Sequence, residues 1–234
     1  MHTHTIASTH AYSTISENCQ WAEINGVKAV AMTDHTMAMP DSPHIWHFEN
    51  LRMVPRKIGN TIVLRGAETN IIDFDGNLDV DENFLKNMEW VVCSMHKQTM
   101  PTGTPQEIAK AYINIMKNPY VDLIAHSTTS YFQCDFEMLV KGAVEYDKLI
   151  EINESSINVK SGSRENCYEL LKLCEKYGAK VCVDTDSHFC QQIGKATSAF
   201  KILEECNFPE KLVINSDWNI LREWLLKKRP YLDI

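Results

Sequence analysis

Short apolar runs alternate with stretches of helical spacing along the chain, and this alternation most constrains how it can fold. The runs are nearly continuous in apolar residues and are bounded by polar ones. Strands of this kind are typical of a parallel sheet covered by helices on its outside. We predict strands over 27–35, 61–70, 89–96, 121–126, 148–153 and 180–188, with a shorter one over 211–215.

Helical patterns fill the intervals between these runs. The segment "TPQE" is a good helix start, because Thr104 can cap the helix, Pro105 suits its first position and Glu107 completes a capping box. No linker-like break interrupts the alternation, so we predict a single α/β domain over residues 1–234. The predicted helices are 16–25, 104–117, 135–145, 163–177, 193–206 and 216–228.

Polar residues of metal-ligand type fall at the ends of the predicted strands. In α/β barrels the carboxyl ends of the strands share one face, and that face carries the chemistry. We therefore expect these residues to form one site, together with three histidines near the start of the chain. The candidates are His2, His4, His10, His35, Glu68, His96, His126, Asp186 and His188.

Seven imidazoles and two carboxylates, without cysteine, describe a nitrogen and oxygen site for zinc, manganese or iron. Nine candidates exceed what one tetrahedral ion requires, so we expect two or three ions that share a bridging carboxylate and a bridging hydroxide. Clustered ions generate hydroxide near neutral pH and clamp the attacking and leaving oxygens of a displacement. The reaction that gains most from such a clamp is hydrolysis of a phosphate ester.

The bulk composition excludes several other classes of protein. A net charge of −8 argues against a binder of long nucleic acids, although bound metal ions still permit an anionic substrate. No apolar run is long enough for a membrane span, and no secretory signal segment is visible. The eight cysteines are scattered and include no C-x-x-C pair, which indicates reduced thiols and a cytoplasmic protein.

Several ordered motifs resemble the PHP (polymerase and histidinol phosphatase) superfamily. They are "HTHTIASTHAYS", "TDH", "RGAETN", "MH" at 95–96, "AH" at 125–126, "EINESS" and "DTDSH". Within the superfamily, "STHAYST" and "PHIWHF" most resemble the YcdX-type phosphatases. The resemblance covers nearly the whole chain and implies a distorted (β/α)7 barrel of the TIM-like kind. It also implies a centre of three divalent metal ions, usually zinc.

The resemblance also implies how the ligands divide among these ions. One ion would be held by His2, His4, Glu68 and Asp186. Glu68 would bridge to a second ion, completed by His96 and His126. The third ion would be held by His10, His35 and His188. This division uses every candidate found at the strand ends.

Two departures from the family pattern concern the start of the chain and the fourth strand. Family members normally begin with a strand and a D-x-H-x-H motif, whereas Met1 directly precedes His2 here. We therefore expect a truncated first strand, with His2 and His4 on an unanchored terminus and a weakened first metal site. The usual His-Pro-Gly is also absent, since "STTS" follows His126, which changes the substrate contacts.

Other polar residues have weaker claims on the site. Lys97, Ser155 and Ser156 could contact the phosphate of a substrate, although a solvated lysine and helix-capping serines are the alternatives. Asp34 could orient His35 or simply end its strand. His44 and His47 lie outside the strand-end pattern, so we expect a structural or lid role for them. No protein nucleophile is predicted.

The leading interpretation is a metal-dependent phosphatase that hydrolyses a small phosphomonoester by attack of a metal-bridging hydroxide. Its partner is then a small phosphorylated substrate, and neither a membrane nor a long nucleic acid. Cleavage of phosphodiesters in short oligonucleotides is a second interpretation, and an amidohydrolase ranks lower because the ligands exceed what that family needs. A metal-binding module without activity is the non-catalytic alternative.

Overall fold

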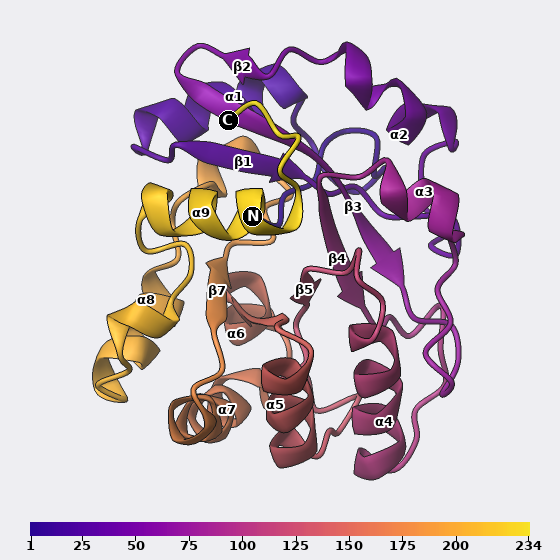
Figure 1. Ribbon diagram of the computed structural model, residues 1–234, viewed down its shortest axis with the longest axis vertical. Helices are drawn as coiled ribbons and strands as arrows, with labels where there is room; N and C mark the ends of the chain where they lie inside the picture. The colour runs from indigo at the N-terminus through magenta and orange to yellow at the C-terminus, as the bar shows by residue number, and fades with distance from the viewer.

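A strongly curved, mainly parallel sheet forms the frame of the protein. The computed structural model describes residues 1–234, and Figure 1 shows its sheet with helices on the outside. Six parallel strands follow one another in the order β1-β3-β4-β5-β6-β7, and β2 pairs antiparallel with β3 at the side. Their bounds are Ala29–Met32 (β1), Lys57–Ile58 (β2), Thr61–Asn70 (β3), Trp90–Ser94 (β4), Leu123–Ile124 (β5), Leu149–Asn153 (β6) and Val181–Asp184 (β7).

The first residues of the chain lie between the two ends of this sheet. Thr3 forms a parallel bridge with Ser187 beyond β7, and its carbonyl accepts a hydrogen bond from Thr33 N beyond β1 at 2.8 Å. The predicted distorted (β/α)7 barrel of the PHP type is confirmed, with a first strand reduced to this short segment. The expectation of an unanchored terminus is wrong, because main-chain hydrogen bonds hold the segment on both sides and bury His2 and His4 completely.

Nine helices surround the sheet. Thr14 and Thr104 begin α1 and α4 with complete capping boxes, as "TPQE" predicts for the second of them. α4, α5 and α7 pack side by side along one side of the barrel (Figure 1). The bounds are Ile15–Ile24 (α1), Trp46–Asn50 (α2), Glu82–Lys86 (α3), Pro105–Met116 (α4), Phe136–Glu145 (α5), Glu154–Val159 (α6), Ser163–Tyr177 (α7), Thr197–Glu205 (α8) and Trp218–Lys228 (α9).

Of three apolar clusters, the two largest lie on opposite faces of the curved sheet. The larger cluster packs the outer face against the surrounding helices and includes Val91 of β4, Ile108 of α4 and Leu139 of α5. The smaller cluster fills the interior, where α9 places Leu221, Trp224 and Leu225 near the starts of the strands. No helix is both long and apolar enough to cross a membrane.

The interior face of the sheet changes from apolar to polar along each strand. Side chains two residues apart in a strand share a face. In β3 the interior series therefore runs from Leu64 to Glu68, and in β6 it runs from Leu149 to Glu151. α9 covers the apolar end of this face, so the carboxyl ends of the strands are left for chemistry.

The structure corrects several details of the sequence-based assignment. The predicted strand 211–215 is wrong: residues Glu210–Leu212 form a 3-10 helix, and Val213 makes only an isolated bridge to Val181. The helices α2, α3 and α6 and the strand β2 were not predicted. They contain six residues or fewer, too few for periodicity to reveal.

Gly66 in the middle of β3 allows neighbouring backbones to approach closely. A Cβ atom at this position would lie 2.7 Å from the carbonyl oxygen of Trp90 and 3.1 Å from that of Met32. Both obstacles are main chain and cannot rotate away. We expect Gly66→Ala to lower the free energy of unfolding by about 1–3 kcal/mol. Urea denaturation would test this. Gly26→Ala serves as a comparison: no atom lies within 4 Å of an added Cβ there, so any loss of stability comes from the positive φ and not from a close contact. An unchanged midpoint for Gly66→Ala would contradict it.

Candidate metal centre

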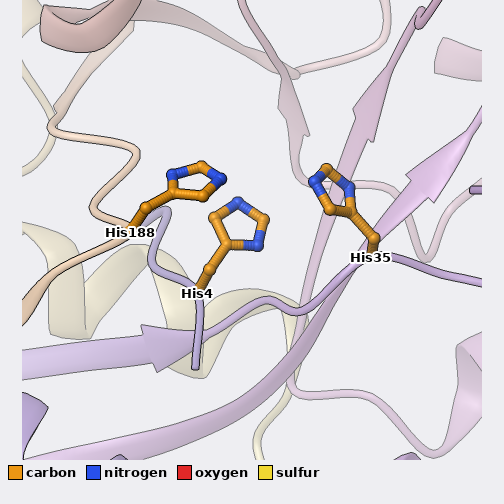
Figure 2. A group of neighbouring side chains, drawn as sticks. All are labelled: His4, His35 and His188. Carbon is orange, nitrogen blue, oxygen red and sulfur yellow. The ribbon is translucent and has the colours of Figure 1, made fainter. Parts of the chain in front are cut away.

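All nine predicted ligands meet at the carboxyl ends of the strands. Four groups of three side chains have ligand atoms that all lie within 4.8 Å of one another. Figure 2 shows one of them, in which the imidazoles of His4, His35 and His188 face one another from three separate segments. The four groups are His4, His35 and His188; His2, His4 and Asp186; His10, His35 and Asp41; and His35, Glu68 and His96.

Glu68 stands at the middle of the cluster and is completely buried. Its Oε2 lies 2.9 Å from His35 Nδ1 and 3.2 Å from His2 Nε2. Its Oε1 lies 3.1 Å from His126 Nε2 and 3.5 Å from His96 Nε2. The two oxygens of one carboxylate therefore face two different sets of imidazoles, which is the arrangement of a bridging ligand.

Asp186 and His188 close the cluster from the loop after β7. Asp186 Oδ1 lies 3.1 Å from His4 Nε2, and His188 Nε2 lies 2.7 Å from His10 Nε2. The backbone of Asp186 has a φ of +50°, a conformation that L residues rarely adopt. Sparsely populated backbone geometry of this kind often accompanies functional sites.

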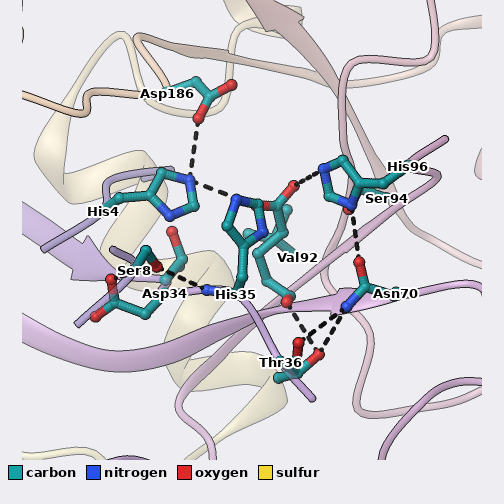
Figure 3. A network of polar contacts seen from close by, with 12 residues as sticks. His4, Ser8, Asp34, His35, Thr36, Asn70, Val92, Ser94, His96 and Asp186 are labelled. Carbon is teal, nitrogen blue, oxygen red and sulfur yellow. Dashed lines mark hydrogen bonds and ion pairs between the residues drawn. The ribbon is translucent and has the colours of Figure 1, made fainter. Parts of the chain in front are cut away.

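Oxygen acceptors bonded to Nδ1 fix the orientation of four imidazoles. The Nδ1 atoms of His2, His10, His96 and His188 each lie within 2.7–2.9 Å of an oxygen that can only accept a hydrogen bond. Nδ1 must therefore donate, and in the neutral ring Nε2 carries the free lone pair toward the cluster. The acceptors are Glu151, Asp41, the Asn70 side chain and the Asp186 carbonyl (Figure 3 shows the His96–Asn70 contact).

Burial and the mutual proximity of the groups set their protonation states. Burial together with the neighbouring His35 lowers the pKa of His4 to about 4, and burial also lowers the pKa of His96 and His188. The pKa of Glu68 lies well below its usual value, because the surrounding imidazoles outweigh the effect of burial. These shifts favour the neutral imidazole and the ionised carboxylate that bind metal ions, whereas neighbouring carboxylates outweigh burial and raise the pKa of His2 and His35.

The donor set fits divalent cations. Lone pairs of His10 and His188 point at each other at 2.7 Å, and the buried Glu68 Oε2 lies within 2.9–3.4 Å of three imidazole nitrogens without a hydrogen bond to any of them. Buried polar atoms normally have partners, so these mark the place of a missing electrophile. Imidazole nitrogen and carboxylate oxygen suit zinc, manganese and iron. No cysteine is among the candidate ligands.

Asp34 holds the loop between His4 and His10 and does not contact the His35 ring. Its buried carboxylate accepts hydrogen bonds from Thr5 N at 2.8 Å and Ser8 Oγ at 2.8 Å. Ser8 Oγ in turn accepts from the backbone N–H of His35 at 3.1 Å, as Figure 3 shows. Asp34 therefore affects the position of His35 indirectly, through the hydroxyl of Ser8.

The two histidines of "PHIWHF" stay outside the cluster. His47 Nε2 lies 3.1 Å from Asp34 Oδ2. Through Asp34, this contact links α2 to the loop between His4 and His10. The ring of the exposed His44 packs edge-on against Trp46. Neither histidine is among the grouped ligand atoms, and the structural or lid role stays a prediction.

The three predicted phosphate-binding residues are not brought together. Lys97 lies beside His96 at a cavity next to the cluster. Ser155 lines a different cavity with Thr185 and Phe189, and none of the candidate ligands borders it. Ser156 is completely buried, and its backbone N–H donates to Asn153, which is the capping residue of α6. Neither serine caps α6, and Ser155 borders none of the candidate ligands.

Sequence reasoning missed two carboxylates, Asp41 and Glu151. Asp41 lies in the irregular segment after β1, where no periodicity could place it. Glu151 is completely buried, and its Oε2 accepts from His126 N at 2.7 Å and from Asn153 Nδ2 at 2.9 Å. His126 has a φ of +31°, so Glu151 also stabilises an unusual backbone conformation. A charge within "LIEIN" was the available signal, since buried charges require partners.

Known proteins are similar to this chain in sequence and in fold. The family model of the PHP domain matches residues 1–206. Proteins described as "probable phosphatase" from Clostridium novyi and Acetivibrio thermocellus are each 40% identical, over 100% and 97% of this chain and 96% and 95% of their own length. A histidinol phosphate phosphatase structure from Lactococcus lactis, solved with zinc, L-histidinol and phosphate, superimposes with a TM-score of 0.63 at 13% identity. It covers 89% of this chain and 93% of its own.

Proposed function

The chain belongs to the PHP domain family and is a phosphatase, and we propose that it hydrolyses small phosphomonoesters at a centre of three divalent metal ions. Two observations carry the proposal: the Nδ1 atoms of four imidazoles are held by oxygen acceptors, and the Glu68 carboxylate faces the nitrogens of five imidazoles. Acceptors that point Nε2 of each ring toward one place serve metal binding, whereas a packed core has no need of them.

We assign the ligands from these contacts. His2, His4, Glu68 and Asp186 form the first group, since their ligand atoms lie 3.1–3.5 Å apart. Glu68 belongs also to the second group, with His96 and His126. His10, His35 and His188 form the third group, in which His10 Nε2 lies 2.7 Å from His188 Nε2 and the rings of His10 and His35 stack with their centres 5.5 Å apart. Zinc is the proposed metal, as in the similar Lactococcus lactis protein, with manganese and iron suited to the same donors.

The chain's own groups prepare the site for this reaction. When bound, clustered divalent ions supply Lewis acidity and lower the pKa of water toward neutrality. The buried cluster of Glu68, Glu151 and Asp186 concentrates negative charge, which raises the pKa of His2 above its usual value despite its burial. The same field favours a cation at this place. Burial raises the pKa of the Cys93 thiol to about 12, so it offers no thiolate nucleophile at neutral pH.

Hydrolysis of simple esters by the metal-loaded protein tests the proposal. We expect phenyl phosphate to be hydrolysed with zinc or manganese, to lose hydrolysis after chelation, and to regain it when metal is restored. Under the same conditions bis(4-nitrophenyl) phosphate should react far more slowly. Faster turnover of this diester or of a dinucleotide would favour the phosphodiesterase alternative. Bound metal without hydrolysis of either ester would favour an inactive metal-binding module.

Glu151→Gln is expected to weaken metal binding about 10- to 100-fold, because an amide cannot serve both contacts of this carboxylate. If the amide oxygen accepts from His2, the NH2 group faces the N–H of His126. If it is turned round, the NH2 group donates to His2 Nδ1 and forces the proton onto Nε2, which removes the ligand lone pair.

Competition with a chromophoric chelator measures this loss directly, without reference to turnover. Glu169→Gln, an exposed site on α7, is the matched control and should bind metal as the original protein does. Unchanged affinity in Glu151→Gln, with the circular dichroism spectrum of the original protein, would contradict the prediction.

A further inference from the structure

A cavity of about 380 Å³ opens directly beside the metal cluster. His96 and His126 form part of its wall, and the rest comes from the loops after β4 and β5 and from the end of α6. A phosphoryl group at the cluster would have its leaving group within reach of this cavity. The volume is at the lower end of the range that binds small organic molecules and exceeds what a phosphate alone would fill.

The lining of the cavity carries positive charge without any compensating carboxylate. Lys97 and Lys160 both border it, and no aspartate or glutamate does. Neither lysine has a carboxylate partner within 4.0 Å. In a chain with a net charge of −8, this local excess of positive charge favours an anion.

Apolar and aromatic surface accompanies the two ammonium groups. Lys97 Nζ lies 4.3 Å from the centre of the Tyr131 ring, which positions the charge at the edge of the cavity. Tyr131 and Val159 are exposed, and Phe132 packs edge-on against Tyr131. Such a surface suits the flat or apolar body of an organic molecule.

We propose that this cavity binds the leaving group of the substrate, and that this group has a flat organic body with a second negative charge held by Lys97 and Lys160. The inference rests on the proposed phosphomonoesterase function and narrows its substrate class. The second charge is a carboxylate or a second phosphate. The two lysines thus determine specificity, while the cluster acts on the phosphoryl group.

Two esters that differ only in this charge test the inference. The probes are 4-carboxyphenyl phosphate and the neutral 4-carbamoylphenyl phosphate, which has nearly the same shape. The measured quantity is the ratio of kcat/KM for the two esters, so that effects common to both cancel. We expect Lys160→Gln and Lys97→Gln each to lower the carboxyl-to-carbamoyl ratio about tenfold, the range of one charge-assisted hydrogen bond.

Lys195→Gln is the matched control, because Lys195 lines a different cavity and should leave the ratio unchanged. A third ester, 1,4-phenylene bisphosphate, distinguishes a second phosphate from a carboxylate. If its kcat/KM exceeds that of 4-carboxyphenyl phosphate, a second phosphate is the preferred group. Equal losses for both esters, or an unchanged ratio in both lysine variants, would overturn the inference and leave the phosphatase intact. If the original protein hydrolyses neither ester, the proposed function fails, and the inference fails with it.

Discussion

Glu68→Gln is expected to lower kcat/KM for a phosphomonoester on the order of a thousandfold, the largest effect of any substitution considered. Its two oxygens lie 2.9–3.5 Å from the nitrogens of five imidazoles, all of them candidate ligands. Glutamine keeps the volume but removes the charge, and its NH2 group would face imidazole nitrogens. The first two metal groups would then lose their common ligand.

Measurement of kcat/KM with excess metal separates lost chemistry from weak loading. In Glu68→Gln the metal content should fall together with the activity. The variant should remain folded at the temperature of the assay. Glu165→Gln, an exposed site on α7, is the control and should retain the original rate. Full activity in Glu68→Gln with unchanged metal content would show that this carboxylate is not the bridge.

Arg229→Met is expected to destabilise the protein by about 3–5 kcal/mol, because it leaves a buried carboxylate without its counter-ion. Asp122 is completely buried, and both of its oxygens accept from Arg229 at 2.7 and 2.8 Å. The guanidinium also donates to the carbonyl of Tyr120 at 3.0 Å. This pair fastens the end of α9 to the start of β5, at the end of the barrel away from the candidate ligands.

Urea denaturation of the metal-free proteins measures this effect without a contribution from bound ions. Lys227→Met lies on the same helix at an exposed position and should change the free energy of unfolding by less than about 1 kcal/mol. The double variant Asp122→Asn/Arg229→Met should recover part of the loss, because no charge is then left buried. A loss below about 1 kcal/mol for Arg229→Met alone would mean that water reaches Asp122.

The order of the strands and the main helices could be predicted because both depend on local patterns. The run 61–70 coincides with β3, and the helical pattern 163–177 coincides with α7. The run 211–215 was apolar in the same way but forms only a bridge at Val213, since its neighbour Ile214 packs into the interior cluster beside α9. Tertiary packing decided that case, and no local pattern reveals it.

The positions of the candidate ligands could be predicted because strand ends in a parallel barrel converge. Contacts between irregular segments could not be predicted, because such segments carry no periodic pattern that would indicate which of them meet. The anchoring of His2 and His4 depends on Thr3 pairing across the sheet, and the contact between His10 and Asp41 joins two loops. Glu151 could have been predicted as part of the site, because it shares a face of β6 with Leu149 and Asn153.

The number of metal ions bound per chain tests the central claim most directly. Elemental mass spectrometry of the active, untagged protein should find about three divalent ions per chain, as expected for clustered metals that share a bridging carboxylate. His188→Ala should lower this number by about one, because it removes a ligand of the third group alone. Full phosphatase activity with one ion per chain or none would contradict the account.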